Sequence, residues 1–156
     1  MKFPDVSGSN LQRERVNLPV DLEGELNMLF IPFQQWQQAI VESWIPWARE
    51  IEQGFPGLSY YELPTIEQLP LLARFFINEG MRAGIPDPVS RQRTITLYVD
   101  KSSFCQALGM NTEKTIYILL VDRQGNVIDQ QQGEYSPEKA RLLLEAIEQS
   151  LMGEKS

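Results

Sequence analysis

One stretch of this sequence, residues 26–51, constrains the fold more than any other. Residues 26–33 form a nearly continuous apolar run, as expected for a strand that is covered on both faces. After this run, apolar residues recur every three or four positions, which predicts a helix with one apolar face; they are Trp36, Ile40, Trp44, Trp47, Ala48, Ile51 and Phe55. Such helical spacing favours core packing of the three tryptophans over an exposed binding ridge. The stretch therefore predicts an α/β domain built around this strand and helix.

Strand and helix patterns alternate along the rest of the chain. Runs of apolar, aromatic and β-branched residues predict strands at residues 58–63, 94–99, 115–121 and 127–132. Helical spacing predicts helices at residues 71–81, at 102–108 with Ser102 as N-cap, and from the N-cap Ser136 to Gly153. Proline and glycine mark residues 64–70 and 84–93 as loops, and residues 1–24 as an irregular arm or a small hairpin.

A helix between two strands implies a right-handed crossover and parallel pairing. We therefore expect a mixed central sheet of about five strands, in the order 94–99, 58–63, 26–33, 115–121 and 127–132. The first three should be parallel and the fourth antiparallel to them, with helices on both faces in a three-layer α/β fold. A chain of 156 residues can bury a core without cross-links, so a single domain is predicted to span residues 1–156.

Composition excludes several classes of site. The chain has one cysteine, Cys105, and no histidine, so it can form no intramolecular disulfide, no Cys/His zinc site and no His-based catalytic triad. Its net charge of −7 disfavours nucleic acid as a partner. No apolar run is long enough to span a bilayer, and no signal peptide is visible. We expect a soluble protein, cytoplasmic or peripheral to a membrane, without a metal or other cofactor.

Three pieces of the sequence resemble the thioredoxin-like fold, in the form found in peroxiredoxins and thiol-disulfide reductases. They are the arm FPDVSG with LPVDLEG, the aromatic strand end and proline-containing helix of residues 33–46, and the hairpin IYILLVDRQGNV. The order of strands and helices is also similar to that of this fold. The resemblance implies one thioredoxin-like domain over most of the chain.

The same resemblance locates a redox site that the chain lacks. If Pro46 matches the helix-kinking proline of thioredoxins, the two cysteines of that family fall on Gln38 and Val41. The family's cis-proline would lie near residues 114–116, where this sequence has no proline. Thiol-disulfide exchange needs an attacking thiolate and normally a resolving thiol. The resemblance therefore implies a redox-inactive protein without catalytic residues.

A further stretch is similar to a narrower family. The sequence LPLLARFFINEGMRAGIPD, followed by RTITLYVD, resembles the bacterial and mitochondrial ATP-synthase assembly factors, which are redox-inactive proteins of this fold. This resemblance implies a chaperone-like module with a protein partner, namely a membrane-sector subunit of the synthase. A binding or assembly module is therefore the favoured function.

Cys105 leaves a second function open. It is either a small buried hydrophobe, which is the usual state of a free cysteine, or the reactive thiol of a one-cysteine enzyme or sensor. The buried state is favoured because the chain has no histidine or second cysteine that could activate or resolve the thiol. Rapid alkylation of Cys105 in the folded protein would favour the enzyme.

The basic residues of this acidic chain suggest a partner-binding site. The candidates are Arg74, Arg82, Arg91 and Arg93. In one interpretation they are structural, and form a solvated basic rim or ion pairs with Glu79 and Asp87. In the other they bind an acidic side chain, a chain terminus or a lipid headgroup. If they form a site, Arg82→Ala with Arg93→Ala should weaken partner capture and leave the thermal midpoint nearly unchanged.

Overall fold

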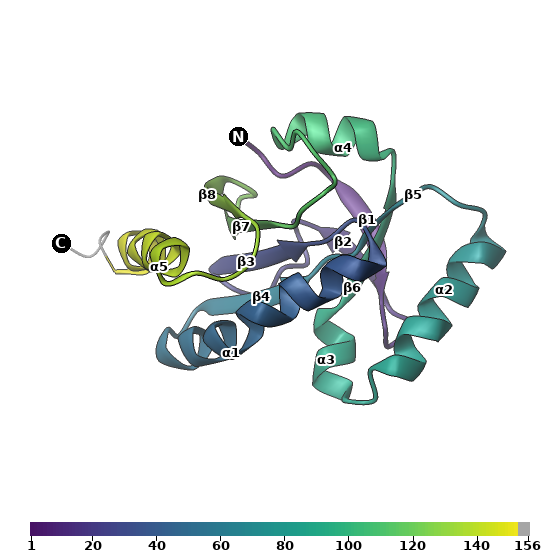
Figure 1. The fold of residues 1–156 in the computed structure, drawn as a ribbon, viewed down its shortest axis with the longest axis horizontal. Helices are drawn as coiled ribbons and strands as arrows, with labels where there is room; N and C mark the ends of the chain where they lie inside the picture. Colours follow the sequence, from purple (N-terminus) through teal and green to yellow (C-terminus); the bar gives the residue numbers. More distant parts are fainter. Residues whose placement is uncertain (153–156) are drawn as a thin grey trace.

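The computed structural model describes residues 1–152 as a mixed α/β fold with two sheets (Figure 1); Gly153, predicted to end the last helix, lies outside the described residues. The first sheet has the order β4-β3-β7-β8, and its strands are β3 (Leu26–Ile31), β4 (Leu58–Glu62), β7 (Tyr117–Asp122) and β8 (Val127–Gln132). β3 is entirely buried, parallel to β4 and antiparallel to β7, and β7 and β8 form an antiparallel hairpin. These pairings confirm four strands of the predicted sheet.

The second sheet corrects the rest of that prediction. Its order is β2-β1-β6-β5, and its strands are β1 (Val6–Asn10), β2 (Arg15–Leu18), β5 (Thr65–Glu67) and β6 (Ile95–Val99). A single five-stranded sheet is therefore wrong, because β6 pairs with β1 and β5 and meets β4 at an isolated bridge between Glu62 and Thr94. The small N-terminal hairpin is confirmed as β1 and β2.

Pro64 lies where the hydrogen-bond ladders of the two sheets meet. It has no backbone N–H and cannot continue a ladder as a donor. Leu63 N donates to Phe30 O in β3, at 2.7 Å, and Thr65 N donates to Pro32 O, just after β3, at 2.9 Å. Between them, Pro64 O accepts from Leu97 N in β6, at 2.8 Å. The segment after Pro64, predicted as a loop, therefore contains the short strand β5.

The helices confirm most of the predicted order, and several of them pack against the first sheet. They are α1 (Gln38–Gly54), α2 (Leu71–Gly84), α3 (Pro88–Arg93), α4 (Lys101–Ala107) and α5 (Pro137–Leu151), with a 3-10 turn, η1 (Gln35–Gln37), before α1. α1 and α5 pack on one face, where Trp44 and Leu143 belong to the same core cluster. The opposite face packs against α4 and the second sheet, through residues such as Phe104 and Leu97. Trp44 is fully buried but Trp36 is 57% exposed, so only part of the tryptophan face is core.

Two helix starts differ from the prediction. Residues 84–93 are not only a loop, because α3 begins after Asp87, whose Oδ2 accepts from Ser90 N at 3.0 Å. α4 begins after Asp100 instead of Ser102, because Asp100 Oδ1 accepts from Ser103 N at 3.2 Å. In both cases an aspartate provides the acceptor that the first helical N–H groups lack.

α2 confirms a predicted helix but lies with its most apolar side toward solvent. None of its residues is buried, and Leu72, Phe75 and Phe76, which define its apolar spacing, are 68%, 54% and 65% exposed. Figure 1 shows α2 at the periphery of the molecule, after an extended connection from β5. Within residues 1–152, no helix is both long enough and apolar enough to cross a membrane.

Candidate functional site

A buried glutamine, Gln37, closes the junction between β3 and α1. Its side chain has no exposed surface. Its Oε1 accepts from the backbone N–H groups of Phe33, at 2.7 Å, and Gln34, at 3.2 Å, and its Nε2 donates to Glu113 O at 2.7 Å. One amide thus satisfies two donors before the helix and one acceptor in the loop before β7. The junction is therefore held together by hydrogen bonds from a side chain that cannot ionise.

The two positions matched to the cysteines of thioredoxins have different surroundings. Gln38 is the first residue of α1 and partly buried, and its Nε2 donates to Glu62 Oε1 at 3.0 Å. Val41 is fully buried in the core beneath α1. Neither an amide nor an isopropyl group can attack a disulfide, since that attack needs a thiolate.

Glu62, the partner of Gln38, has an altered acidity. Burial raises the pKa of its carboxyl above the usual range, and the hydrogen bond from Gln38 opposes this rise. The nearby Glu42 raises the pKa further, whereas Arg93 and Arg49 lower it. Raised carboxyl pKa values occur at catalytic sites, but here burial is a sufficient structural cause.

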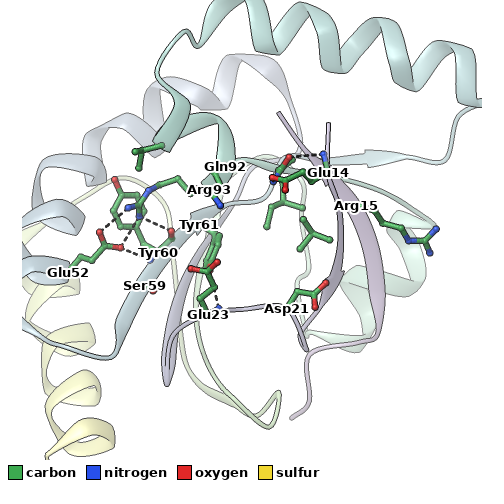
Figure 2. Close-up of a pocket in the computed structure, with 14 residues that line it drawn as sticks. Glu14, Arg15, Asp21, Glu23, Glu52, Ser59, Tyr60, Tyr61, Gln92 and Arg93 are labelled. Carbon is green, nitrogen blue, oxygen red and sulfur yellow. Dashed lines mark hydrogen bonds and ion pairs between the residues drawn. The ribbon is translucent and has the colours of Figure 1, made fainter. Parts of the chain in front are cut away.

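The cavity drawn in Figure 2 lies between the N-terminal hairpin, β4 and α3, and has a volume of about 370 Å³. Its wall contains the carboxylates of Glu14, Asp21, Glu23 and Glu52. Glu52 forms a bidentate ion pair with Arg93, with N–O distances of 2.8 and 3.0 Å. The Arg93 guanidinium carbon also lies 4.1 Å from the centroid of the Tyr60 ring, within cation–π range.

The same ion pair completes the outer edge of β4. Tyr60 N donates to Glu52 Oε2, and Arg93 Nη1 donates to Tyr60 O, both at 3.1 Å (Figure 2). Unpaired N–H and C=O groups at a strand edge can pair with another chain, and side chains that occupy them prevent this. Arg93, one of the candidate partner-binding residues, therefore has its guanidinium engaged within the chain.

The other three candidate arginines bind backbone carbonyls. Arg74 Nε donates to Leu69 O, Arg82 Nε to Leu11 O, Arg91 Nε to Ile85 O and Arg91 Nη2 to Arg82 O. The expected pairing with Glu79 and Asp87 is not found, because Glu79 pairs with Arg13 at 2.6 Å and Asp87 caps α3. No ion pair within residues 1–152 involves these three arginines. Since carbonyl groups do not neutralise a guanidinium, the positive charge of these three arginines is only partly offset, by the nearby carboxylate of Glu79, whose pKa Arg82 and Arg91 help to lower.

Cys105 is buried in α4, with 9% of its surface exposed. Burial raises the pKa of its thiol, the carboxylate of Glu113 raises it further, and Lys101 opposes these effects. Lys101 itself pairs with Glu113 at 2.8 Å. A raised pKa lowers the thiolate fraction at neutral pH, so the environment of Cys105 does not activate it.

Gln37 and Glu52 are the structural residues that the sequence pattern does not reveal. Gln37 is one of several glutamines at the junction, and helical periodicity does not distinguish its buried amide from exposed neighbours. The one signal in the sequence is the position of Gln37 at the start of a helix, where backbone N–H groups need acceptors that a glutamine side chain can provide. Glu52 meets Arg93 only through the tertiary fold, 41 residues along the chain.

Comparison with solved structures shows a thioredoxin-like fold. The thioredoxin domain of a thiol-disulfide oxidoreductase from Bacteroides vulgatus has a TM-score of 0.58 and 15% identity, over 94% of this chain and 95% of that one. The exposed lipoprotein thioredoxin of Streptococcus pneumoniae has a TM-score of 0.55 and 18% identity, over 93% and 99%. BsSco, a member of the Sco family of cytochrome c oxidase assembly proteins, has a TM-score of 0.61 and 12% identity, over 97% and 94%. These likenesses confirm the predicted fold class.

Sequence comparison identifies the family. No curated protein matches the chain as a relative. The model of the family described as ATP10 protein matches residues 1–149, which include the β3–α1 junction, α2 and the β7–β8 hairpin. The chain belongs to the ATP10 protein family.

Proposed function

We propose that this protein assists the assembly of ATP synthase by binding one of its subunits, and that it does so without thiol-disulfide chemistry. Its membership of the ATP10 family, an ATP-synthase assembly family, and its thioredoxin-like fold support an assembly role. BsSco, which has a similar fold, belongs to a family that assembles a different respiratory complex. The fold is thus compatible with a role in the assembly of membrane complexes.

The composition of the β3–α1 junction carries the redox-inactive part of this proposal. Gln37 bridges the end of β3 to Glu113, and Gln38 and Val41 stand at the positions matched to cysteines. The chain's one thiol, Cys105, lies in α4, is buried and has a raised pKa. Without a resolving thiol, a mixed disulfide with a substrate could not be released intramolecularly.

The arginines of α2 and α3 are the proposed contact site for the protein partner. Arg74, Arg82 and Arg91 belong to no ion pair within residues 1–152, and arginine binds carboxylate groups bidentately. Arg93 is a weaker candidate, because Glu52 occupies both of its terminal nitrogens. An acidic segment of the partner subunit would fit this surface.

The experiment combines a test of redox activity with a test of capture. In an insulin-reduction assay with dithiothreitol, the protein should show no activity above a Cys105→Ser control. As tagged bait on detergent-solubilised native membranes, it should enrich subunits of ATP synthase, identified by mass spectrometry. Insulin reduction above the control would overturn the redox-inactive part, and the absence of synthase subunits would overturn the assembly part.

The proposed arginine site is tested by comparing partner capture between two arginine variants. Arg82→Gln with Arg91→Gln should weaken capture, whereas Arg141→Gln, an exposed arginine of α5 that pairs with Glu138 and Glu145, should not. Arg82 and Arg91 also donate hydrogen bonds to backbone carbonyls, so their substitution can lower the thermal stability. Capture is therefore measured well below the thermal midpoint of each variant. Equal capture by the two would place the partner site elsewhere.

A further inference from the structure

We propose that the start of α2 is a lipid-binding surface, which inserts Leu71, Leu72, Phe75 and Phe76 into the interface of a bilayer that carries anionic headgroups. We refer to these four residues as the apolar face of α2. This surface goes beyond the proposed assembly role, because it does not depend on which protein subunit is bound.

The apolar face of α2 is unusually exposed for residues of this size. Its four side chains are exposed by 80%, 68%, 54% and 65% in chain order, and the rings of the two phenylalanines contact each other at 5.9 Å between centroids. The helix is attached to the body by its other side, where Ile77 and Met81 are partly buried and Tyr98 Oη donates to Arg74 O at 3.2 Å. α2 is thus fixed by one side and presents a larger apolar side to solvent.

The size of this surface argues against a second copy of the chain as its occupant. Four side chains of this size and exposure offer roughly 400–500 Å² of apolar surface. A stable protein interface buries about 800 Å² on each partner. The apolar face also lies on a single peripheral helix (Figure 1), and a lipid interface requires no complementary groove. Leucine and phenylalanine are typical of helices that lie in a membrane interface.

The charge around this face favours an anionic membrane. Residues 70–93 contain four arginines against two carboxylates, in a chain whose net charge is −7. Of these two carboxylates, Glu79 is neutralised by Arg13, while Arg74 and Arg82 of α2 belong to no ion pair within residues 1–152. Anionic headgroups attract basic residues beside an apolar face and repel the acidic remainder of the surface. The side of the molecule that bears α2 is therefore the side that would approach the bilayer.

Vesicle flotation tests the proposal with the protein as it exists. The wild type should bind vesicles of phosphatidylcholine mixed with phosphatidylglycerol, more strongly than vesicles of phosphatidylcholine alone. Leu72→Gln with Phe76→Gln should lower the partition coefficient about a hundredfold, since each buried apolar side chain contributes about tenfold. The matched control is Val20→Gln with Ile128→Gln, which changes two exposed apolar residues elsewhere, at 76% and 42% exposure, and should bind like the wild type.

A fluorescent label gives a second measurement of insertion, and it does not require the removal of two apolar residues. In a Cys105→Ser background, Phe76→Cys carries an environment-sensitive fluorophore, and Val20→Cys carries it in the control. A blue shift on addition of the mixed vesicles at position 76 alone would support insertion of α2. A shift at both positions or at neither would overturn it.

The remaining outcomes also decide the proposal. Failure of the wild type to bind either vesicle, or equal binding by the Leu72→Gln, Phe76→Gln protein, would overturn it. If that double variant instead loses capture of synthase subunits in detergent while the wild type ignores vesicles, the apolar face binds protein and the lipid proposal is wrong. Because the vesicles contain no protein, a negative result here leaves the capture test of the assembly role intact.

Discussion

Gln37 donates a hydrogen bond from Nε2 to the carbonyl oxygen of Glu113, at 2.7 Å, and so joins the β3–α1 junction to the loop before β7. The same amide accepts from two backbone N–H groups through Oε1. Gln37 is thus a buried structural contact of this junction, directly before Gln38, one of the two positions matched to the thioredoxin cysteines.

Gln37→Ala should therefore destabilise the fold. The substitution leaves the N–H groups of Phe33 and Gln34 and the carbonyl of Glu113 without this partner, which should cost about 3 kcal/mol in the free energy of unfolding. Urea denaturation measures the change. Gln35→Ala, at an exposed neighbour in η1, is the control and should change stability by less than about 0.5 kcal/mol. Equal effects of the two substitutions would contradict the structural role of Gln37.

The ion pair between Glu52 and Arg93 should show strong coupling. Arg93→Ala leaves a partly buried carboxylate and the carbonyl of Tyr60 without a donor, so the structure predicts a loss of about 2 kcal/mol, not the unchanged midpoint expected if Arg93 only binds a partner. Glu52→Ala should have a similar effect. The double variant should lose less than the sum, with a coupling of about 1–2 kcal/mol in a double-mutant cycle. Simple additivity would show that the pair contributes little.

Glu62 should make stability depend on pH. Its pKa in the folded protein is raised above the ordinary value of 4.5, mainly by burial, so folding favours the protonated form. This favourable contribution is complete below 4.5 and is lost as the pH rises through the folded pKa. Glu62→Gln, which stays neutral, should therefore raise the thermal midpoint relative to the wild type at neutral pH, with a difference that shrinks at acidic pH. Glu148→Gln, at an exposed carboxylate, is the control, and a Glu62→Gln effect independent of pH would contradict the burial argument.

The core of the fold could be predicted from the sequence because its signals are local. The continuous apolar run at β3 and the helical spacing after it depend on neighbouring residues, and both elements and their sheet partners are confirmed. The second sheet could not be predicted in this way. Its formation depends on tertiary contacts, namely the hydrogen bond from Leu97 N to Pro64 O and the close approach of β1 to β6, where a Cβ at Gly8 would clash with Thr96 O.

The candidate site was less accessible to sequence reasoning, because its contacts are tertiary. The spacing of Leu72, Phe75 and Phe76 identifies an apolar side of α2, but spacing alone cannot tell whether that side faces the core or solvent. The arginine cluster was visible as composition, but the division between Arg93, bound to Glu52, and the carbonyl-bound Arg82 and Arg91 required the folded geometry. Where each of these side chains points therefore had to come from the structure.

Cys105 should react slowly while the protein is folded. Its thiol is buried and its pKa is raised by that burial, so both access and the thiolate fraction are low. Iodoacetamide modification, followed by mass spectrometry, should be slow in buffer and fast in urea. Rapid modification of the folded protein would instead favour a thiol-dependent enzyme or sensor.

Capture of ATP-synthase subunits by the Cys105→Ser protein tests the central claim most directly, since this variant has no thiol at all. If the protein acts by binding, the tagged variant and the wild type should enrich the same synthase subunits from detergent-solubilised native membranes, to the same extent. If the variant is folded, as shown by an unchanged thermal midpoint, but captures none of the subunits that the wild type captures, then the thiol is required and the claim of a redox-independent assembly function is wrong.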